Sequence, residues 1–225
     1  PGAPIYQQST GHPMNSELYY EAIGIFKDQA SLDEYPHWSG ARPGDVIFKD
    51  VSKDGVIDGN DRIRYYKSNI PRSNIGMQLN LGYGQFDLSI LLQGSFGAIR
   101  YVKTYSGEAG NYLKDFYDNR WTEDNPNASQ PRAFNREQEY WRNQKNTLFI
   151  RETDYMRLKD FQFGYNLSEN IVNKIGIQAL RFYISGYNLL TISPNLKDFD
   201  PESISIEGNS YPVQRIINGG ITLTF

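Results

Sequence analysis

Apolar and polar residues alternate most clearly in the last stretch of the chain, residues 213–225. From Ile217 onward, an apolar residue or glycine occupies every second position up to Phe225, and the positions between them hold asparagine, glycine and threonine. A period of two residues is typical of a β-strand with one apolar and one polar face. A soluble domain rarely places its terminal residue on the apolar face of a long strand, whereas a transmembrane barrel pairs every strand, including the last. The pattern therefore indicates a membrane β-barrel.

The same alternation recurs along the chain and predicts further strands. Two of them are separated only by Gly84 and Gln85, which is the length of a tight hairpin turn. In another, residues 156–159 have the opposite phase to the residues that follow, so we expect a β-bulge near Lys159. The strands are expected near residues 18–26, 72–83, 85–98, 153–167, 178–190 and 212–225.

The connections between these strands alternate between long and short. Long segments rich in Gly, Pro, Asn and Asp occupy residues 28–71, 99–152 and 191–210, whereas the connections at Gly84 and at 167–176 are short. Outer-membrane barrels have long extracellular loops and short periplasmic turns, so the chain is expected to end on the periplasmic side. We predict an all-β fold, with the whole chain forming part of one large antiparallel transmembrane barrel. About six strands are fewer than the roughly eight of the smallest barrels, so further strands must complete the wall.

Composition narrows the class of protein further. The chain has no apolar run of about 18 residues, which a transmembrane helix would need. Its net charge of -3 gives no basic surface, so we expect no nucleic-acid partner. The absence of cysteine excludes disulfides and thiolate chemistry. The first residues do not resemble the secretory signal that a barrel requires, so we expect this chain to be a fragment or a processed piece.

A soluble β-sandwich is the main structural alternative, since its strands alternate in the same way. Two features argue against it: the expected strands are long, and their polar faces carry Gly, Asn, Gln and Ser rather than Lys and Glu. A solvent-facing sheet is usually more charged, whereas a water-filled lumen suits small polar groups.

Residues 50–61, D-V-S-K-D-G-V-I-D-G-N-D, match the spacing of a calcium-binding EF-hand loop. Gly55 falls at position 6, where such a loop bends sharply, and the hydrophobic Ile57 follows at position 8. We predict a calcium ion that stiffens an extracellular loop; an Asp/Gly-rich turn that binds no metal is the alternative. The expected ligands, at positions 1, 3, 5, 7 (through the carbonyl), 9 and 12, are Asp50, Ser52, Asp54, Val56, Asp58 and Asp61.

No arrangement of residues in the chain predicts catalysis, and we expect no enzyme. His12 and His37 lie far apart without a partner at ligand spacing, and no carboxylates form a pair typical of a glycosidase. The second long loop carries Trp121, Tyr140 and Trp141 among amide side chains, a composition that suits contact with a sugar. These aromatic residues could instead pack the loop's own core or lie at the membrane interface.

Four stretches spread over nearly the whole chain carry a family resemblance. They are Tyr20–Asp28 (Y-E-A-I-G-I-F-K-D), Pro43–Arg62 (P-G-D-V-I-F-K-D-V-S-K-D-G-V-I-D-G-N-D-R), Tyr155–Leu167 (Y-M-R-L-K-D-F-Q-F-G-Y-N-L) and Phe182–Thr191 (F-Y-I-S-G-Y-N-L-L-T). In this order they resemble the SusC/RagA family of TonB-linked outer-membrane proteins. The resemblance is specific to the C-terminal strands of the family's barrel.

The resemblance implies a barrel of about 22 strands, plugged by an N-terminal domain, in the outer membrane of a Gram-negative cell. It also implies import of oligosaccharides or peptides, driven by TonB, with a SusD-like surface lipoprotein acting as a lid. The plug and the segment that contacts TonB belong to the N-terminal part of the family, and nothing in this chain matches them. The terminal Phe225 resembles the aromatic end of the signal read by the barrel-assembly machinery, and strand closure would explain it equally well.

Three functions are compatible with the sequence. The leading hypothesis is a TonB-dependent nutrient importer, in which this chain contacts outer-membrane lipid and the rest of the same barrel. The second is a secreted calcium-binding β-sandwich that binds a ligand through residues 50–61 and the side chains of Trp121 and Trp141. The third is a passive porin-type barrel, which only the plug and the TonB-contacting segment would distinguish from the first.

Overall fold

The computed structural model describes residues 2–102, 113–133, 144–203 and 213–225. These residues divide into two compact units, which are described separately. One unit comprises the described parts of 1–70 and 99–151, and the other comprises the described parts of 71–98, 152–203 and 213–225. The expectation of one barrel domain over the whole chain therefore stays a prediction. Among the described residues, no helix has the length and apolar character needed to cross a membrane.

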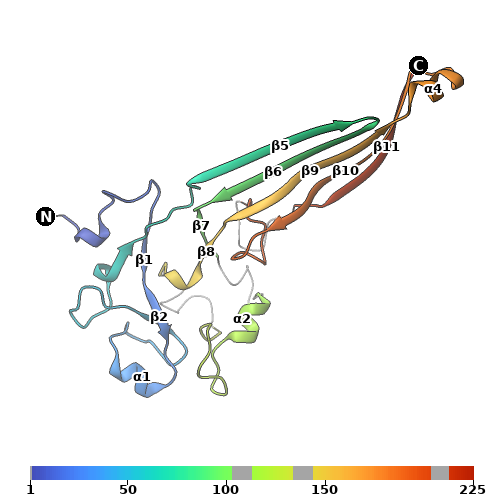
Figure 1. Cartoon of the computed structure of the whole chain (residues 1–225). Coiled ribbons are helices and arrows are strands. Elements are labelled where there is room, and N and C mark those ends of the chain that lie inside the picture. The colour runs from blue at the N-terminus through green and yellow to red at the C-terminus, as the bar shows by residue number, and fades with distance from the viewer. Residues whose placement is uncertain (1, 103–112, 134–143, 204–212) are drawn as a thin grey trace. The chain divides into compact units, whose positions relative to one another are not determined.

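The second unit is built on a five-stranded antiparallel sheet (Figure 1). The order of its strands is the order in which the chain makes them, so each strand pairs with its neighbour in sequence, as in an up-and-down barrel wall. The strands match the ranges expected from alternation to within a few residues. They are β5 (Ser73–Tyr83), β6 (Phe86–Phe96), β9 (Tyr155–Asn166), β10 (Ala179–Ile192) and β11 (Ile216–Thr224).

All the short connections lie at one end of this sheet. Tyr83 pairs with Phe86, so β5 and β6 are joined by two residues, and Gly84 has the positive φ (58°) that such a turn requires. The connection from β9 to β10 holds the short helix α4 (Glu169–Val172) and a 3-10 turn, Asn173–Ile175. Figure 1 shows α4 and the C-terminus at this same end. The opposite end of the sheet leads to the long segments.

The sheet contains two β-bulges at the same level. Between β6 and β9, Leu91 pairs with Asp160 and Leu92 with Leu158, so Lys159 is left out of the register. The bulge expected near Lys159 is therefore confirmed. On the other side of β9, Tyr187 pairs with Asp160 and Leu190 with Leu158, so β10 also has an extra residue there.

The first unit contains only short elements around one core. Strand β1 (Leu18–Tyr20) pairs with β4 (Arg62–Arg64), β2 (Ala22–Ile25) with β3 (Val46–Phe48), and β7 (Ile99–Tyr101) with β8 (Ile150–Glu152). The helices are α1 (Gln29–Glu34) and α2 (Lys114–Asn119), with 3-10 turns at Ile5–Gln7, Gly59–Asp61 and Thr147–Phe149. Its core is the cluster Tyr20, Val46, Phe48, Ile57, Phe116 and Phe149.

The strand expected at residues 18–26 differs from the prediction. The chain changes pairing partner at Glu21, so two short strands form, and neither pairs with the five-stranded sheet. The reason is visible in the burial: Tyr19 and Tyr20 lie on opposite sides of β1 and both are buried, whereas a barrel strand would leave its apolar side open to lipid. The described barrel-type sheet therefore has five strands rather than about six.

Candidate functional site

One face of the five-stranded sheet is polar, and the pairing register aligns its residues in rows across the strands. One row joins five small polar or amide side chains on successive strands: Asn80, Ser89, Gln162, Ser185 and Asn218. The hydroxyl of Ser89 donates to Oδ1 of Asn80 at 2.8 Å. Side chains of this kind hydrogen-bond to water or to a polar partner without adding charge. We call this surface the polar face.

An ion pair crosses a whole strand of the polar face. Arg181 on β10 donates from Nε to Oδ1 of Asp87 on β6 at 3.0 Å, and a second bond joins the same side chains, so the pair is bidentate. The strand between them, β9, has Gly164 at this level. A Cβ at Gly164 would lie 2.4 Å from a guanidinium nitrogen of Arg181. The pair therefore depends on the absence of a side chain at this position.

A tyrosine covers another glycine on the same face. Tyr183 on β10 pairs with Gly220 on β11, and its ring lies where a side chain at Gly220 would be, 2.4 Å from an ideal Cβ. The aromatic ring shields the glycine backbone of the neighbouring strand, which stabilises a pairing that glycine by itself weakens.

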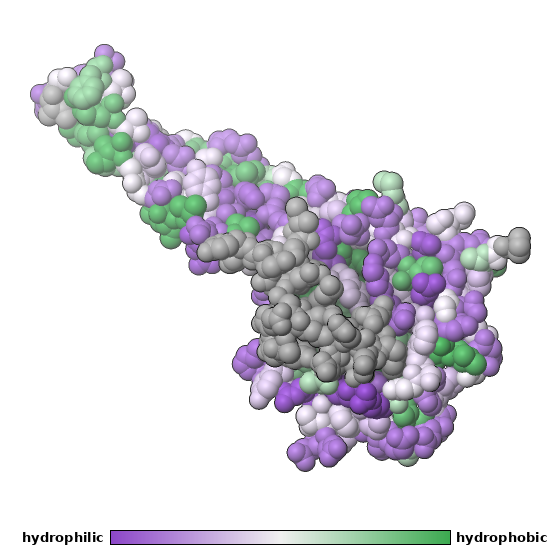
Figure 2. Space-filling model, turned by 180° about the vertical axis from the view of Figure 1, so that it is seen from behind, coloured by the Kyte–Doolittle hydropathy of each residue, from purple (hydrophilic) through white to green (hydrophobic). Residues whose placement is uncertain are grey.

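The opposite face of the sheet is apolar and open. Its rows include Leu81, Leu88, Phe163 and Ile184, and the next row holds Tyr83, Phe86, Tyr165, Phe182 and Ile221. Leu81 is 53% exposed, Ile217 66% and Ile221 65%. Figure 2 shows hydrophobic side chains on the surface at the end of the sheet where α4 and the C-terminus lie. Soluble monomers rarely expose so continuous an apolar surface, whereas a lipid-facing barrel wall requires one.

Aromatic rings gather on the apolar face at its short-turn end. The rings of Phe86 and Tyr165 lie with their centroids 5.0 Å apart, and Tyr83 beside them is 89% exposed. Barrels carry such aromatic residues where the membrane meets water. The terminal Phe225 is largely exposed next to the end of β11. Its role as an assembly signal stays a prediction.

The Asp-rich loop of residues 50–61 is held by bonds from its carboxylates to its own backbone. Asp61 is completely buried; its Oδ1 accepts from the N–H groups of Val51 (2.9 Å) and Ser52 (3.0 Å), and its Oδ2 accepts from that of Asp58 (2.8 Å). Asp50 accepts from the N–H groups of Lys53 and Gly55 at 2.6 and 2.9 Å. Although partial burial acts to raise the pKa of Asp50, these bonds together lower it. The loop is thus a chain of Asx turns.

The predicted calcium ligands are brought together only in part: the hydroxyl of Ser52 donates to Oδ1 of Asp50 at 3.2 Å. Among the described residues, which include all of 50–61, no three acidic or histidine side chains are grouped as a metal ion would require. Asp54 accepts from the N–H of Val56 at 2.9 Å, and Asp58 caps the following 3-10 turn through the N–H of Asn60 at 2.7 Å. The carboxylates in this conformation therefore fit backbone capping better than a calcium ion, and calcium binding stays a prediction.

Of the three aromatic residues expected to contact a sugar, the structure describes one. The indole of Trp121 lies against Gly44, where a Cβ would be 2.6 Å from the ring, and its Nε1–H donates to the carbonyl of Lys27 at 3.1 Å. The ring thus packs against residues outside its own loop, and its contact with a sugar stays a prediction. Tyr140 and Trp141 lie outside the described residues.

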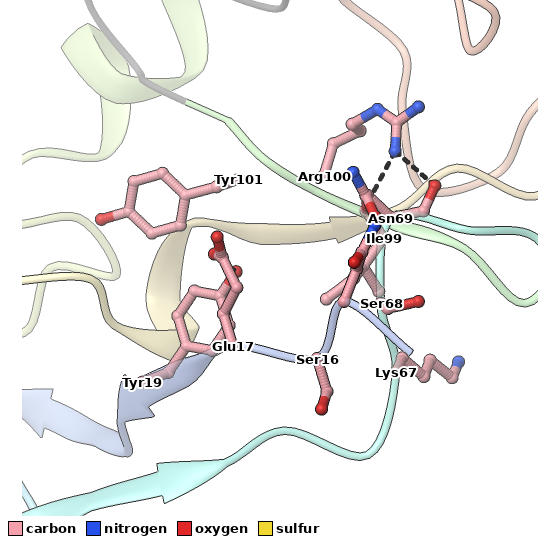
Figure 3. Close-up of a pocket in the computed structure, with 10 residues that line it drawn as sticks. Ser16, Glu17, Tyr19, Lys67, Ser68, Asn69, Ile99, Arg100 and Tyr101 are labelled. Atoms are coloured by element: carbon pink, nitrogen blue, oxygen red, sulfur yellow. Dashed lines mark hydrogen bonds between the residues drawn. The ribbon is translucent and has the colours of Figure 1, made fainter. Parts of the chain in front are cut away.

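The first unit contains a cavity of about 390 Å³ that the sequence did not predict. Figure 3 shows Tyr101, Tyr19 and Glu17 on one side of it and Lys67 and Ser68 on the other. The Tyr19 and Tyr101 rings are stacked with their centroids 6.1 Å apart. The lining residues come from three separate stretches, 15–19, 67–69 and 99–101. No local motif marks them, which is why the sequence did not identify the cavity.

Glu17 supplies the carboxylate of this cavity. It accepts from the hydroxyl of Tyr19 and from Nζ of Lys145, both at 2.8 Å. Burial acts to raise the pKa of Glu17, but these two bonds and the charge of Lys145 together lower it. The cavity therefore offers an ionised carboxylate, an aromatic wall and the Arg100 guanidinium. It can hold a small polar molecule, although the Tyr19 hydroxyl and the Arg100 guanidinium already donate to oxygen atoms of the protein.

Comparison with known proteins identifies the type of chain. No family model matches it. Among curated proteins, it is 29% identical over 232 residues to TonB-dependent receptor P3 of Formosa agariphila and 27% identical over 224 residues to TonB-dependent receptor P26 of the same organism. These matches cover 96% and 90% of the chain. The chain spans only 22% of the length of either relative.

Solved structures give the same result. The fold is similar to that in the structure of the RagAB peptide transporter, with a TM-score of 0.69, 23% identity, and coverage of 93% of this chain and 23% of that one. It is also similar to the RagAB peptide importer in the open-open state, with a TM-score of 0.64, 23% identity, and coverage of 96% and 23%. The predicted resemblance is confirmed. The chain is similar to the C-terminal part of SusC/RagA-type TonB-linked receptors, and its five-stranded sheet has the fold of part of an antiparallel barrel wall.

Proposed function

We propose that this chain forms part of the barrel wall of an outer-membrane, TonB-dependent nutrient importer of the SusC/RagA type. The observation that carries the proposal is the five-stranded sheet, with one open apolar face and one polar face built of aligned small polar residues. An apolar face of this kind suits lipid, and the polar face suits a water-filled lumen or a plug domain. The relatives named as TonB-dependent receptors support the same reading.

The finer parts of the proposal rest on the resemblance and on the connections of the sheet. The short turns and Phe225 face the periplasm, and the long segments face outward. The substrate is an oligosaccharide or a peptide, delivered with a SusD-like surface lipoprotein, and TonB supplies the energy through another part of the same protein. The solved neighbours are named as peptide transporters, which supports a peptide over a glycan. A structural and transport role, rather than catalysis, agrees with relatives named as receptors and transporters.

Two neighbouring residues on β5 test the membrane assignment. Leu79 belongs to the apolar face and Gln78 to the polar face, and both are exposed. An arginine on the lipid face near the middle of the bilayer destabilises a barrel by roughly 2–4 kcal/mol, whereas lumen positions tolerate charge. We expect Leu79→Arg to reduce the amount of heat-modifiable, folded protein in outer-membrane fractions, and Gln78→Arg to leave it unchanged.

Each outcome of this test separates the alternatives. Equal tolerance of both arginines, with a monomer soluble without detergent, would favour the secreted β-sandwich. A folded barrel whose uptake persists in cells without TonB would favour a passive porin. Loss of uptake in those cells, with the asymmetry between Leu79 and Gln78, is the result that the proposal requires.

A further inference from the structure

A fully buried arginine lies on the polar face near the end that leads to the long loops. The side chain of Arg157 on β9 has no exposed surface, and its guanidinium makes three different bonds. Its Nε donates to Oγ1 of Thr191 on β10 at 3.0 Å, one terminal nitrogen donates to Oδ2 of Asp200 at 2.6 Å, and the other donates to Oε2 of Glu202. Asp200 and Glu202 belong to the long segment after β10.

Glu202 connects this segment to two strands of the sheet, β6 and β9. Its Oε1 accepts from the hydroxyl of Tyr155 at 2.8 Å and from Nε2 of Gln93 at 2.9 Å. Its Oε2 accepts from Nζ of Lys159 at 3.3 Å as well as from Arg157. Side chains of β6 and β9 thus bond directly to the Glu202 carboxylate, and Thr191 of β10 bonds to Arg157.

The segment is shaped to present these two carboxylates. Oδ1 of Asp200 accepts from the N–H of Glu202 at 2.9 Å, and the carbonyl of Asp200 accepts from the N–H of Ser203, also at 2.9 Å. Pro201 between them is buried and fixes the backbone further. Residues 198–203 therefore form a preorganised turn rather than a loop that happens to pass near the sheet.

The buried charge of Arg157 is compensated by the turn that covers it. A guanidinium without water is strongly unfavourable unless carboxylates and hydrogen bonds compensate it. Removal of residues 198–203 from the sheet would take both anionic partners from Arg157 at once, so these bonds form together and break together. Packing of Leu196, which is 4% exposed, adds an apolar contact next to the turn.

We propose that Arg157 is a positioning residue that fixes residues 198–203 against the polar face, so that this turn is a permanent part of the channel wall. The inference rests on the proposed function only in taking the polar face as the lining of the channel. The turn also forms one wall of a cavity of about 440 Å³, with Ser193 and Lys197 among its other residues. Fixing the turn keeps the shape of this cavity constant.

The experiment measures access to a residue next to the turn. Because the described chain has no cysteine, Leu196→Cys is introduced into the whole protein in its outer membrane, and intact cells are labelled with a membrane-impermeant maleimide. The parent without this cysteine gives the background. We expect Arg157→Met to speed labelling at Leu196→Cys at least tenfold. Arg157→Lys, which keeps the charge but loses the planar fork, should give an intermediate rate.

Matched variants keep the result interpretable. Arg181→Met breaks a separate ion pair of the polar face, at the opposite end of the sheet, and should leave labelling unchanged. Glu202→Gln removes the shared carboxylate charge and should also speed labelling; it carries the test if Arg157→Met does not reach the heat-modifiable folded state. Folded Arg157→Met and Glu202→Gln proteins labelled at the parental rate would overturn the proposal. A fast rate in a protein whose uptake is independent of TonB would instead contradict only the proposed function.

Discussion

Replacement of Asp61 by alanine tests whether the Asp-rich loop is held by its carboxylates. Asp61 is buried and accepts three backbone N–H bonds, from Val51, Ser52 and Asp58. A hydrogen bond to a charged group contributes roughly 1.5–3 kcal/mol, so the three bonds set an upper bound of roughly 4.5–9 kcal/mol. The donors lie at half-buried residues, where water replaces part of the loss. We expect local opening to become easier by about 3 kcal/mol, or roughly 100-fold.

Hydrogen exchange, read by mass spectrometry on the whole protein in detergent, measures how easily the loop opens. The N–H groups of Val51, Ser52 and Asp58, which donate to Asp61, exchange only when these bonds break. Asp54→Ala is the matched control: the Asp54 carboxylate accepts one bond, at 2.9 Å from Val56, and it should change exchange less than about fivefold. Equal effects of the two substitutions would refute the reasoning. If EGTA raises exchange in the parent to the level of Asp61→Ala, the carboxylates act through calcium, and the calcium prediction is supported instead.

Two further predictions follow from the sheet and the turn attached to it. Gly164→Ala would place a Cβ 2.4 Å from the guanidinium of Arg181, so we expect it to destabilise the folded protein by about 1–3 kcal/mol. Heat-modifiability gels should show this as a lower unfolding temperature. Gly76→Ala is the control and should have little effect, because no atom lies within 4 Å of the Cβ it would add. Partial burial acts to raise the pKa of Glu202, but its bonds and the neighbouring cations lower it below the usual 4.5. Its contribution to stability is therefore complete above that value and is lost as the pH falls through the lower folded pKa. The rate at which Leu196→Cys reacts with 4,4′-dithiodipyridine in detergent should stay low at neutral pH and rise only below pH 4.5, where Glu202 takes up a proton. A rate that already rises at pH 6 would contradict this prediction.

The sequence predicted the five strands of this sheet, among the six it indicated, because the information for them is local. Each strand repeats every two residues, Gly84 supplies the positive φ of a two-residue turn, and the change of phase at Lys159 shows where the register shifts. The strands also pair with their sequence neighbours, so no distant partner had to be identified. When strands pair in the order of the sequence, alternation alone shows which residues lie on the polar face and which lie on the apolar face.

What the sequence could not predict depends on contacts between distant segments. The stretch 18–26 forms strands, but they pair with residues 62–64 and 46–48. Because Tyr19 and Tyr20 are both buried, this stretch does not have the one exposed and one buried face that alternation predicts. Arg157 meets Asp200 and Glu202 only after β10 has been added and the chain has turned back. Their chemistry is visible in the sequence, but their proximity is not.

The two bulges beside Lys159 have a consequence for how such a wall tolerates change. They absorb a shift of one residue within a single level of the sheet, so the part of β9 and β10 nearer the long loops keeps its own register. A one-residue insertion at that level could be taken up by widening an existing bulge. The same insertion nearer Gly84 would have to create a new bulge or move apolar side chains into the lumen. The mouth of the wall can therefore diverge in length during evolution while the remainder stays constrained.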